Sequence, residues 1–255
     1  MRRSLLIYSA ALIVSALLFG LSAHADTIQN DFKRANDYYE AKKYDGAIER
    51  YEQIIDRGVE SSTIYYNLGN AYFKNGDLGH AVLYYMKARR LDPSDEDIQH
   101  NLEFARKFST VQMEGVTLNP IHEFLESITS PYRLSLLGWL SSALFILFIA
   151  MLVIRFGLGI KGSLVKTGIV TSLVLVLMAS GLTTFKYQNE FLTKRAVIIA
   201  DDAPVRSGPT DRSEVELQGA PGLVVEILEQ QDQYYNVLFE NKRRGWINKD
   251  LVALI

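Results

Sequence analysis

The sequence predicts a multidomain membrane protein that consists of an all-α module of helical repeats, two transmembrane helices and a small all-β barrel. Three observations support this fold class. The pattern of residues 28–61 recurs in residues 62–95, and a tandem repeat of this length is typical of stacked helix pairs. Two uncharged apolar runs at 134–154 and 167–185 are each long enough to cross a bilayer. The final part of the chain changes to short β-rich runs separated by turn residues.

The charge distribution argues against nucleic-acid binding. The chain of 255 residues has a formal net charge of −2. Residues 26–115 contain 12 Lys and Arg against 16 Asp and Glu, and residues 196–255 contain 6 against 10. A nucleic-acid binder needs a basic surface, so we expect no nucleic-acid partner. The absence of cysteine excludes disulfides, thiolate metal sites and cysteine nucleophiles.

The first residues have the pattern of a secretory signal. Arg2 and Arg3 precede an apolar run over 5–21, and Ala23-His24-Ala25 supplies small residues at a cleavage site. We therefore expect a signal peptide at 1–25 with cleavage after Ala25. An uncleaved signal anchor is the alternative. Either one places the following residues outside the cytoplasm.

The repeat unit is a pair of helices. The matching positions of the two copies are Ala35 and Gly69, Tyr38 and Tyr72, Tyr44 and Leu78, Ala47 and Ala81, and Tyr51 and Tyr85. The second copy, with Tyr65-x-x-Leu68-Gly69-x-x-Tyr72 and then Ala81, Tyr85, Ala88 and Pro93, resembles the tetratricopeptide repeat (TPR). We expect a TPR module over 26–110, with repeats at 28–61 and 62–95. Asn75-Gly76 should end one helix and Pro93 the next.

A further helix is expected to cover the second repeat. Ile98, Leu102, Ala105 and Phe108 follow helical spacing, which predicts a capping helix over 95–108. Repeat arrays normally need about three units for stability. We therefore also expect a partner or self-association to stabilise the module.

The resemblance implies a binding groove on the concave face of the repeats. The residues expected on that face are Phe32, Asn36, Tyr39 and Glu40 from the first copy and Tyr66, Asn70, Phe73 and Lys74 from the second. Asn36 and Asn70 occupy the same slot, and their amides are candidates to bracket the backbone or carboxylate of a peptide. The alternative is that they are ordinary solvated polar residues.

The middle of the chain predicts a linker and a hairpin of two membrane spans. The linker 111–133 contains an amphipathic helix that starts at Asn119-Pro120, and this helix lies either in the membrane interface or against the capping helix. The spans at 134–154 and 167–185 are joined by 155–166, a loop whose charged residues are all basic. Basic loops collect on the cytoplasmic side. We therefore expect a multi-pass protein of the plasma (inner) membrane with both soluble modules on the extracytoplasmic, periplasmic side.

Residues 196–255 predict a small antiparallel barrel. The β-rich runs lie at 196–199, 223–228 and 234–239. Val205-Arg206-Ser207-Gly208-Pro209 and Gly245-Trp246-Ile247 are similar to bacterial SH3-type domains, although Ala203-Pro204 departs from the usual Leu-Asn. The aromatic residues Tyr234, Tyr235 and Trp246 form a possible ligand surface. The alternative interpretation of Trp246 is that its side chain belongs to the barrel core.

No catalytic constellation is visible in the sequence. The four histidines are scattered without zinc-ligand spacing, and there is neither a phosphate-binding loop nor a nucleophile elbow. We expect no enzymatic activity, no cofactor and no metal site.

The order of signal, repeats, two spans and barrel resembles the BatE-type proteins of the Bat aerotolerance system. That resemblance implies a scaffold or adaptor for protein–protein interactions in a cell-envelope complex, linked to aerotolerance or stress resistance. It also implies membrane proteins with von Willebrand A domains as partners, and indirectly a MoxR-type ATPase. The alternative is a cell-wall tether or sensor whose SH3-type domain binds peptidoglycan.

Overall fold

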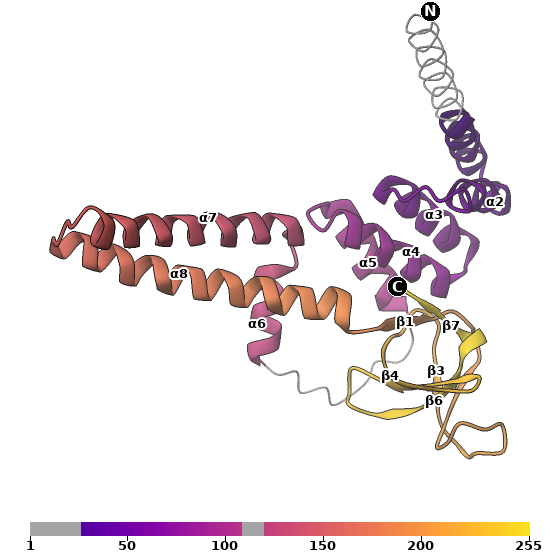
Figure 1. Ribbon diagram of the computed structural model, residues 1–255. Helices are drawn as coiled ribbons and strands as arrows, with labels where there is room; N and C mark the ends of the chain where they lie inside the picture. The colour runs from indigo at the N-terminus through magenta and orange to yellow at the C-terminus, as the bar shows by residue number, and fades with distance from the viewer. Residues whose placement is uncertain (1–26, 109–119) are drawn as a thin grey trace, which may run out of the picture.

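The computed structural model describes residues 27–108 and 120–255. Helical repeats, a long helical hairpin and a small antiparallel sheet follow one another along the chain, as Figure 1 shows. This is the predicted fold class. The predicted signal at 1–25 and the linker residues up to Asn119 lie outside the described residues.

The repeats begin with a helix that runs through residues 27–40. The four helices that follow are α2 (Tyr44–Ile55), α3 (Ser62–Asn75), α4 (Leu78–Leu91) and α5 (Glu96–Phe108). As predicted, α3 ends before Gly76, whose φ of 89° is the left-handed conformation that glycine favours at a helix end. Asp77 caps α4 by accepting a hydrogen bond from the His80 backbone N–H at 3.0 Å.

Small residues allow the helices of a repeat to cross closely. A Cβ added at Gly69 would lie 2.7 Å from Cδ1 of Tyr85, which is nearer than such atoms approach. Tyr85 and its counterpart Tyr51 are almost completely buried. The two tyrosines therefore fill the space that the small residues leave.

Helix α5 covers the second repeat and matches the first helix of a third. Its residues Ile98, Leu102 and Ala105 are buried. They lie one full repeat after Ile64, Leu68 and Ala71 of α3, which are also buried. Phe108 is 53% exposed, so its predicted place on the covered face of the helix is wrong. The repeat pattern therefore extends beyond the two predicted copies.

Within residues 27–108 and 120–255, two helices are long and apolar enough to cross a membrane. They form the hairpin of α7 (Leu134–Leu152) and α8 (Ser163–Tyr187), extended by the π-helical turns η1 (Val153–Gly157) and η2 (Gln188–Leu192). No residue of the most apolar window of the first helix is buried, whereas the core helix of a soluble domain would be covered. Helical backbone continues over Arg155 and Lys166, so the loop is shorter than the predicted 155–166.

The hairpin helices pack through small and polar residues. The hydroxyl groups of Ser141 and Thr183 are hydrogen-bonded across the pair at 2.9 Å, and Gly168 lies against the Met151 side chain. The amphipathic helix α6 (Pro120–Thr129) makes its main contact with α8, not with the capping helix. Its Ile121 and Phe124 are 68% and 63% exposed.

The C-terminal barrel is a seven-stranded antiparallel sheet with strand order β3-β2-β6-β5-β4-β1-β7. Its strands are β1 (Arg195–Ile198), β2 (Ala203–Arg206), β3 (Val215–Gly219), β4 (Val224–Gln231), β5 (Tyr234–Leu238), β6 (Arg244–Asn248) and β7 (Val252–Leu254). The sheet curves round a core that includes Val205, Val237 and Ile247. Ala196, Val197 and Ile198 of β1 are all completely buried, so both faces of this strand are covered.

The barrel packs directly on the second repeat. Val197 belongs to the same apolar cluster as Val82 and Met86 of α4. A Cβ added at Gly79 of α4 would lie 2.6 Å from Cα of Ile199, so the two backbones touch. The repeat module is thus stabilised by the barrel of the same chain, whereas a partner or self-association had been expected.

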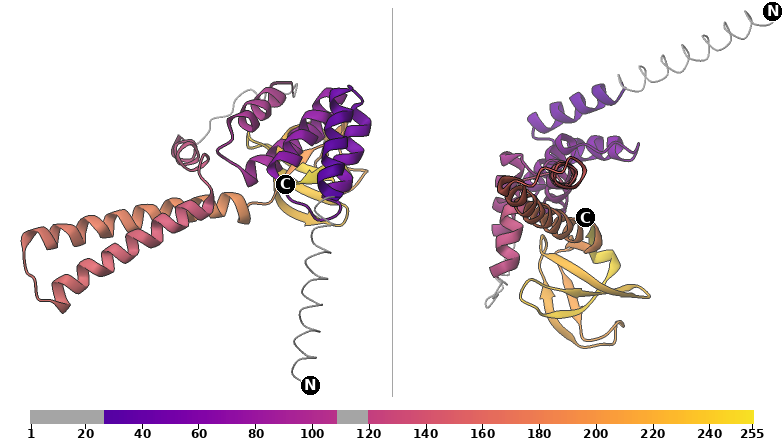
Figure 2. Two further views of the ribbon diagram at one scale, coloured as in Figure 1. Left: turned by 90° about the horizontal axis from the view of Figure 1, so that it is seen from above. Right: turned by 60° about the vertical axis from the view of Figure 1, so that its left-hand side comes forward.

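The repeats and the barrel lie together at one end of the hairpin, and α7 and α8 project away from them (Figures 1 and 2). An ion pair between Arg106 of α5 and Glu240 of the barrel, at 2.5 Å, adds to the contact. The basic residues of the predicted loop are Arg155, Lys161 and Lys166. They lie toward the opposite end of the hairpin, where α7 joins α8.

Candidate functional site

The first helices of the repeats form a groove with a polar floor. A pocket of about 180 Å³ is lined by Asn36, Tyr39, Glu40, Tyr51, Asn67 and Asn70. Four of these six were predicted for the concave face. Tyr51 and Asn67 were not predicted to line it.

Asparagine and tyrosine side chains form a repeating ladder beneath this groove. Asn36 Oδ1 accepts hydrogen bonds from the Tyr51 hydroxyl at 2.5 Å and from the Asn67 amide at 3.4 Å. One repeat later, Asn70 Oδ1 accepts from the Tyr85 hydroxyl at 2.7 Å and from the Asn101 amide at 2.9 Å. Each member of the second set occupies the same repeat position as its counterpart in the first.

The ladder gives Asn36 and Asn70 a structural role that the sequence did not predict. Burial first, and then neighbouring tyrosines, raises the pKa of the Tyr51 and Tyr85 hydroxyls. Both therefore remain protonated donors at neutral pH and hold the asparagine oxygens. Within the described residues the amide NH₂ groups of Asn36 and Asn70 make no hydrogen bond. The groove consequently offers free donors, at two positions one repeat apart, to a carbonyl or carboxylate.

Replacing Asn70 with alanine is expected to destabilise the repeats. The buried Tyr85 hydroxyl loses its acceptor, and an unsatisfied buried donor costs about 1–3 kcal/mol. Urea unfolding followed by circular dichroism measures this loss. Lys74→Ala is the control, because Lys74 is exposed on the same helix and such changes stay within about 0.5 kcal/mol. Equal stability of the two variants would show that the ladder contributes nothing.

An exposed aromatic patch, formed by Phe73, Phe104 and Phe108, adjoins the second repeat. The Phe73 ring centroid lies 5.7 Å from those of Phe104 and Phe108, and the latter two are 5.0 Å apart. Phe104 is 46% exposed and Phe108 is 53% exposed. Only Phe73 had been predicted as a binding residue.

The other predicted groove residues differ in how accessible their side chains are to a bound partner. Phe32 packs against Tyr51 in the core of the first repeat, at 6.1 Å between ring centroids. The Tyr66 hydroxyl accepts a hydrogen bond from Asn101 at 3.0 Å. Lys74 is exposed at the end of α3. Glu40 is exposed too and lines the groove, whereas Lys74 does not line it.

The three aromatic residues predicted on the barrel do not form one exposed surface. Tyr234 is only 6% exposed, and its hydroxyl donates a hydrogen bond to the Asp211 carboxylate at 2.5 Å. Tyr235 packs against the barrel core. Trp246 is half-buried and lies between the buried Gly245 and Ile247 of β6.

Strand geometry places Trp246 on the outer face of the barrel. Adjacent residues of a strand point to opposite sides, and the core cluster does not include Trp246. Its cross-strand neighbour Asn236 has a buried Oδ1 without a hydrogen-bond partner. Trp246 and Asn236 thus lie side by side on the outer face of the sheet. Among the described residues no group of three His, Asp or Glu is arranged to hold a metal ion.

Two family models match separate parts of the chain. One, described as tetratricopeptide repeat, matches residues 32–96, and the other, described as bacterial SH3 domain, matches residues 200–253. The chain therefore combines these two kinds of domain, as the motifs predicted. Both are non-catalytic interaction domains, which favours the binding of protein partners.

A solved structure matches this chain only with low similarity. The crystal structure of yeast Tom70 matches at 18% sequence identity with a TM-score of 0.31. The match covers 65% of this chain and 26% of that one, so this chain spans about a quarter of Tom70. No curated protein matches the sequence.

Proposed function

We propose that this protein is a membrane-anchored scaffold whose repeats hold a protein partner in a cell-envelope complex. The observation that carries the proposal is an uncovered groove beside an exposed aromatic patch. The barrel covers α4, the second helix of its repeat. The groove and the patch stay open; their residues come from the helix at 27–40, from α3 and α5, and, for Tyr51, from α2.

The proposed location is the plasma membrane, with the spans within 134–192 and both modules on the extracytoplasmic side. The two apolar helices support anchoring, and the bacterial SH3 domain favours the cell envelope. The basic residues near the far end of the hairpin favour a cytoplasmic turn. The proposed complex is that of the BatE-type proteins, with von Willebrand A-domain membrane proteins as direct partners, a MoxR-type ATPase as an indirect one, and aerotolerance as the process served.

Photo-crosslinking in native membranes tests the groove. A photoreactive side chain at Glu40 or Lys74 is expected to capture a membrane protein with a von Willebrand A domain. Phe73→Ser combined with Phe104→Ser should reduce the yield about tenfold or more, because aromatic anchors often contribute over about 2 kcal/mol to an interface. Asn70 is not used in this test, because its side chain holds the buried Tyr85 hydroxyl.

Tyr38→Ser is the matched control for the patch variant. Tyr38 is 37% exposed and is absent from the groove lining. Crosslinking that survives the patch variant, or that is lost equally with the control, contradicts groove binding.

The alternative function is a cell-wall tether, which the outward Trp246 and the unpartnered Asn236 favour. Sedimentation of the full chain with purified peptidoglycan distinguishes the two. Retention that is lost with Trp246→Ala and kept with the patch variant would support the tether.

A further inference from the structure

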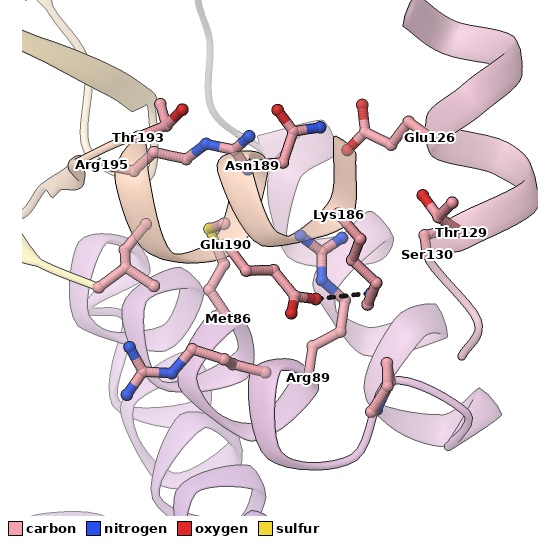
Figure 3. Close-up of a pocket in the computed structure, with 13 residues that line it drawn as sticks. Met86, Arg89, Glu126, Thr129, Ser130, Lys186, Asn189, Glu190, Thr193 and Arg195 are labelled. Atoms are coloured by element: carbon pink, nitrogen blue, oxygen red, sulfur yellow. Dashed lines mark ion pairs between the residues drawn. The ribbon is translucent and has the colours of Figure 1, made fainter. Parts of the chain in front are cut away.

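A pocket of about 100 Å³ lies where the hairpin meets the repeats and the barrel (Figure 3). Its walls come from the end of α4, from α6, from the end of α8 with η2, and from the start of β1. Six lining residues are ionisable: Arg89, Arg90, Glu126, Lys186, Glu190 and Arg195. None of them belongs to the groove.

Among the side chains of this pocket positive charge is in excess, with four cationic groups against two side-chain carboxylates. Lys186 is only 4% exposed, and its Nζ lies 2.6 Å from Glu190 Oε1, so these two charges balance each other. The side chains of Arg89 and Arg195 make no hydrogen bond or ion pair within the part of the chain that the structure describes.

Arg89 is the residue most in need of an acceptor. Its guanidinium points into the pocket beside Lys186 and Glu190 (Figure 3). Burial first, and then repulsion from Arg106 and Arg195, lowers its pKa, with Glu126 and Glu190 acting in the opposite direction. An arginine side chain carries five N–H donors in a planar fork, and leaving them unsatisfied below the surface is costly. An anion that accepts from this fork would recover that cost.

We propose that this pocket binds a phosphate group, with the guanidinium groups of Arg89 and Arg195 as its donors. Arginine forks match phosphate oxygens in geometry and charge. The pocket lies at the base of the apolar hairpin, next to α6 with its exposed Ile121 and Phe124. That level corresponds to the lipid headgroups when the hairpin spans a bilayer. The position therefore favours the phosphate of an anionic phospholipid over free phosphate, although the recognition chemistry is the same.

Thermal unfolding of the full chain in a neutral detergent tests this site. The chain is titrated separately with short-chain phosphatidylglycerol, with phosphatidylcholine of the same acyl chains, and with inorganic phosphate. We expect phosphatidylglycerol to raise the unfolding midpoint at a concentration about tenfold lower than phosphatidylcholine. Arg89→Gln and Arg195→Gln should each raise the half-saturating concentration of phosphatidylglycerol about tenfold, because each removes a charge-assisted contact.

Arg212→Gln is the matched control, since Arg212 is exposed in the loop between β2 and β3 and lies outside the pocket. Inorganic phosphate could saturate the site at the same concentration as phosphatidylglycerol and be equally sensitive to the two arginine variants. That result would support a phosphate site but assign it to the free anion. A wild-type response in both arginine variants overturns the proposal. So does an equal response to the two lipids.

Discussion

Replacing Val197 with aspartate is expected to separate the barrel from the repeats while both remain folded. Val197 is completely buried, but it points away from the barrel core that its neighbours Ala196 and Ile198 enter. Val197 is covered by α4, where it packs in one apolar cluster with Val82 and Met86. An uncompensated buried charge costs about 3–5 kcal/mol. Undocking exposes the new carboxylate to water and avoids that cost.

Amide hydrogen exchange measures this separation. A loss of about 3 kcal/mol is roughly a hundredfold in an equilibrium constant, so the amides that docking protects in 78–91 and 196–199 should exchange up to about that much faster. Residues in the barrel core and in the first repeat should keep their protection. Val215→Asp is the matched control, because it places the same side chain on β3 of the same barrel at a position that is 43% exposed.

Gly79→Ala provides an independent route to the same result. The added Cβ meets the backbone of Ile199 at 2.6 Å and that of Ile198 at 2.9 Å, and backbone atoms cannot move aside as a flexible side chain does. Alanine also favours the helix, so α4 itself should not weaken. Unchanged exchange in both Val197→Asp and Gly79→Ala would mean that the modules are not held together by this interface.

The repeats could be predicted from sequence because their signal is periodic, whereas the docking of the barrel could not. Gly69 and Tyr85 contact each other within one repeat unit, so a single motif implies both. Val82 and Val197 are far apart in the sequence, and nothing in either segment indicates that it contacts the other. One clue was present. Ala196-Val197-Ile198-Ile199 is continuously apolar, which is typical of a strand buried on both faces.

Four of the residues predicted for the groove line one pocket, but the role of each side chain depends on its hydrogen-bond partners. Asn36 and Asn70 have the predicted positions, yet their oxygens hold tyrosines and neighbouring asparagines. Asn101 follows Asn67 at the repeat spacing, a signal that would have revealed a third repeat helix and, with it, Phe104. The Tyr234 hydroxyl is hydrogen-bonded to Asp211 in a distant loop, and strand alternation alone does not predict such a contact.

Under the proposed topology, single cysteines should divide into two groups that differ almost completely in labelling. The chain has no native cysteine, so each introduced thiol is the sole target of a membrane-impermeant maleimide. Lys33→Cys on the first helix and Gln230→Cys on β4 occupy exposed positions and should be labelled from the extracytoplasmic side. Gly162→Cys, between the two long helices, should be labelled only after the membrane is permeabilised.

The choice of Gly162 keeps this experiment independent of the charges that set orientation. A Cβ there meets nothing within 4 Å, and its φ of −70° suits any residue, so the basic residues near the turn can all remain. Lys33 and Gln230 lie in different modules that share one end of the hairpin, which makes their agreement a test of the hairpin itself. Labelling of Gly162→Cys in intact cells, with protection of the other two, would reverse the proposed orientation. Opposite results for Lys33→Cys and Gln230→Cys would mean that the paired helices do not return the chain to the same side of the membrane.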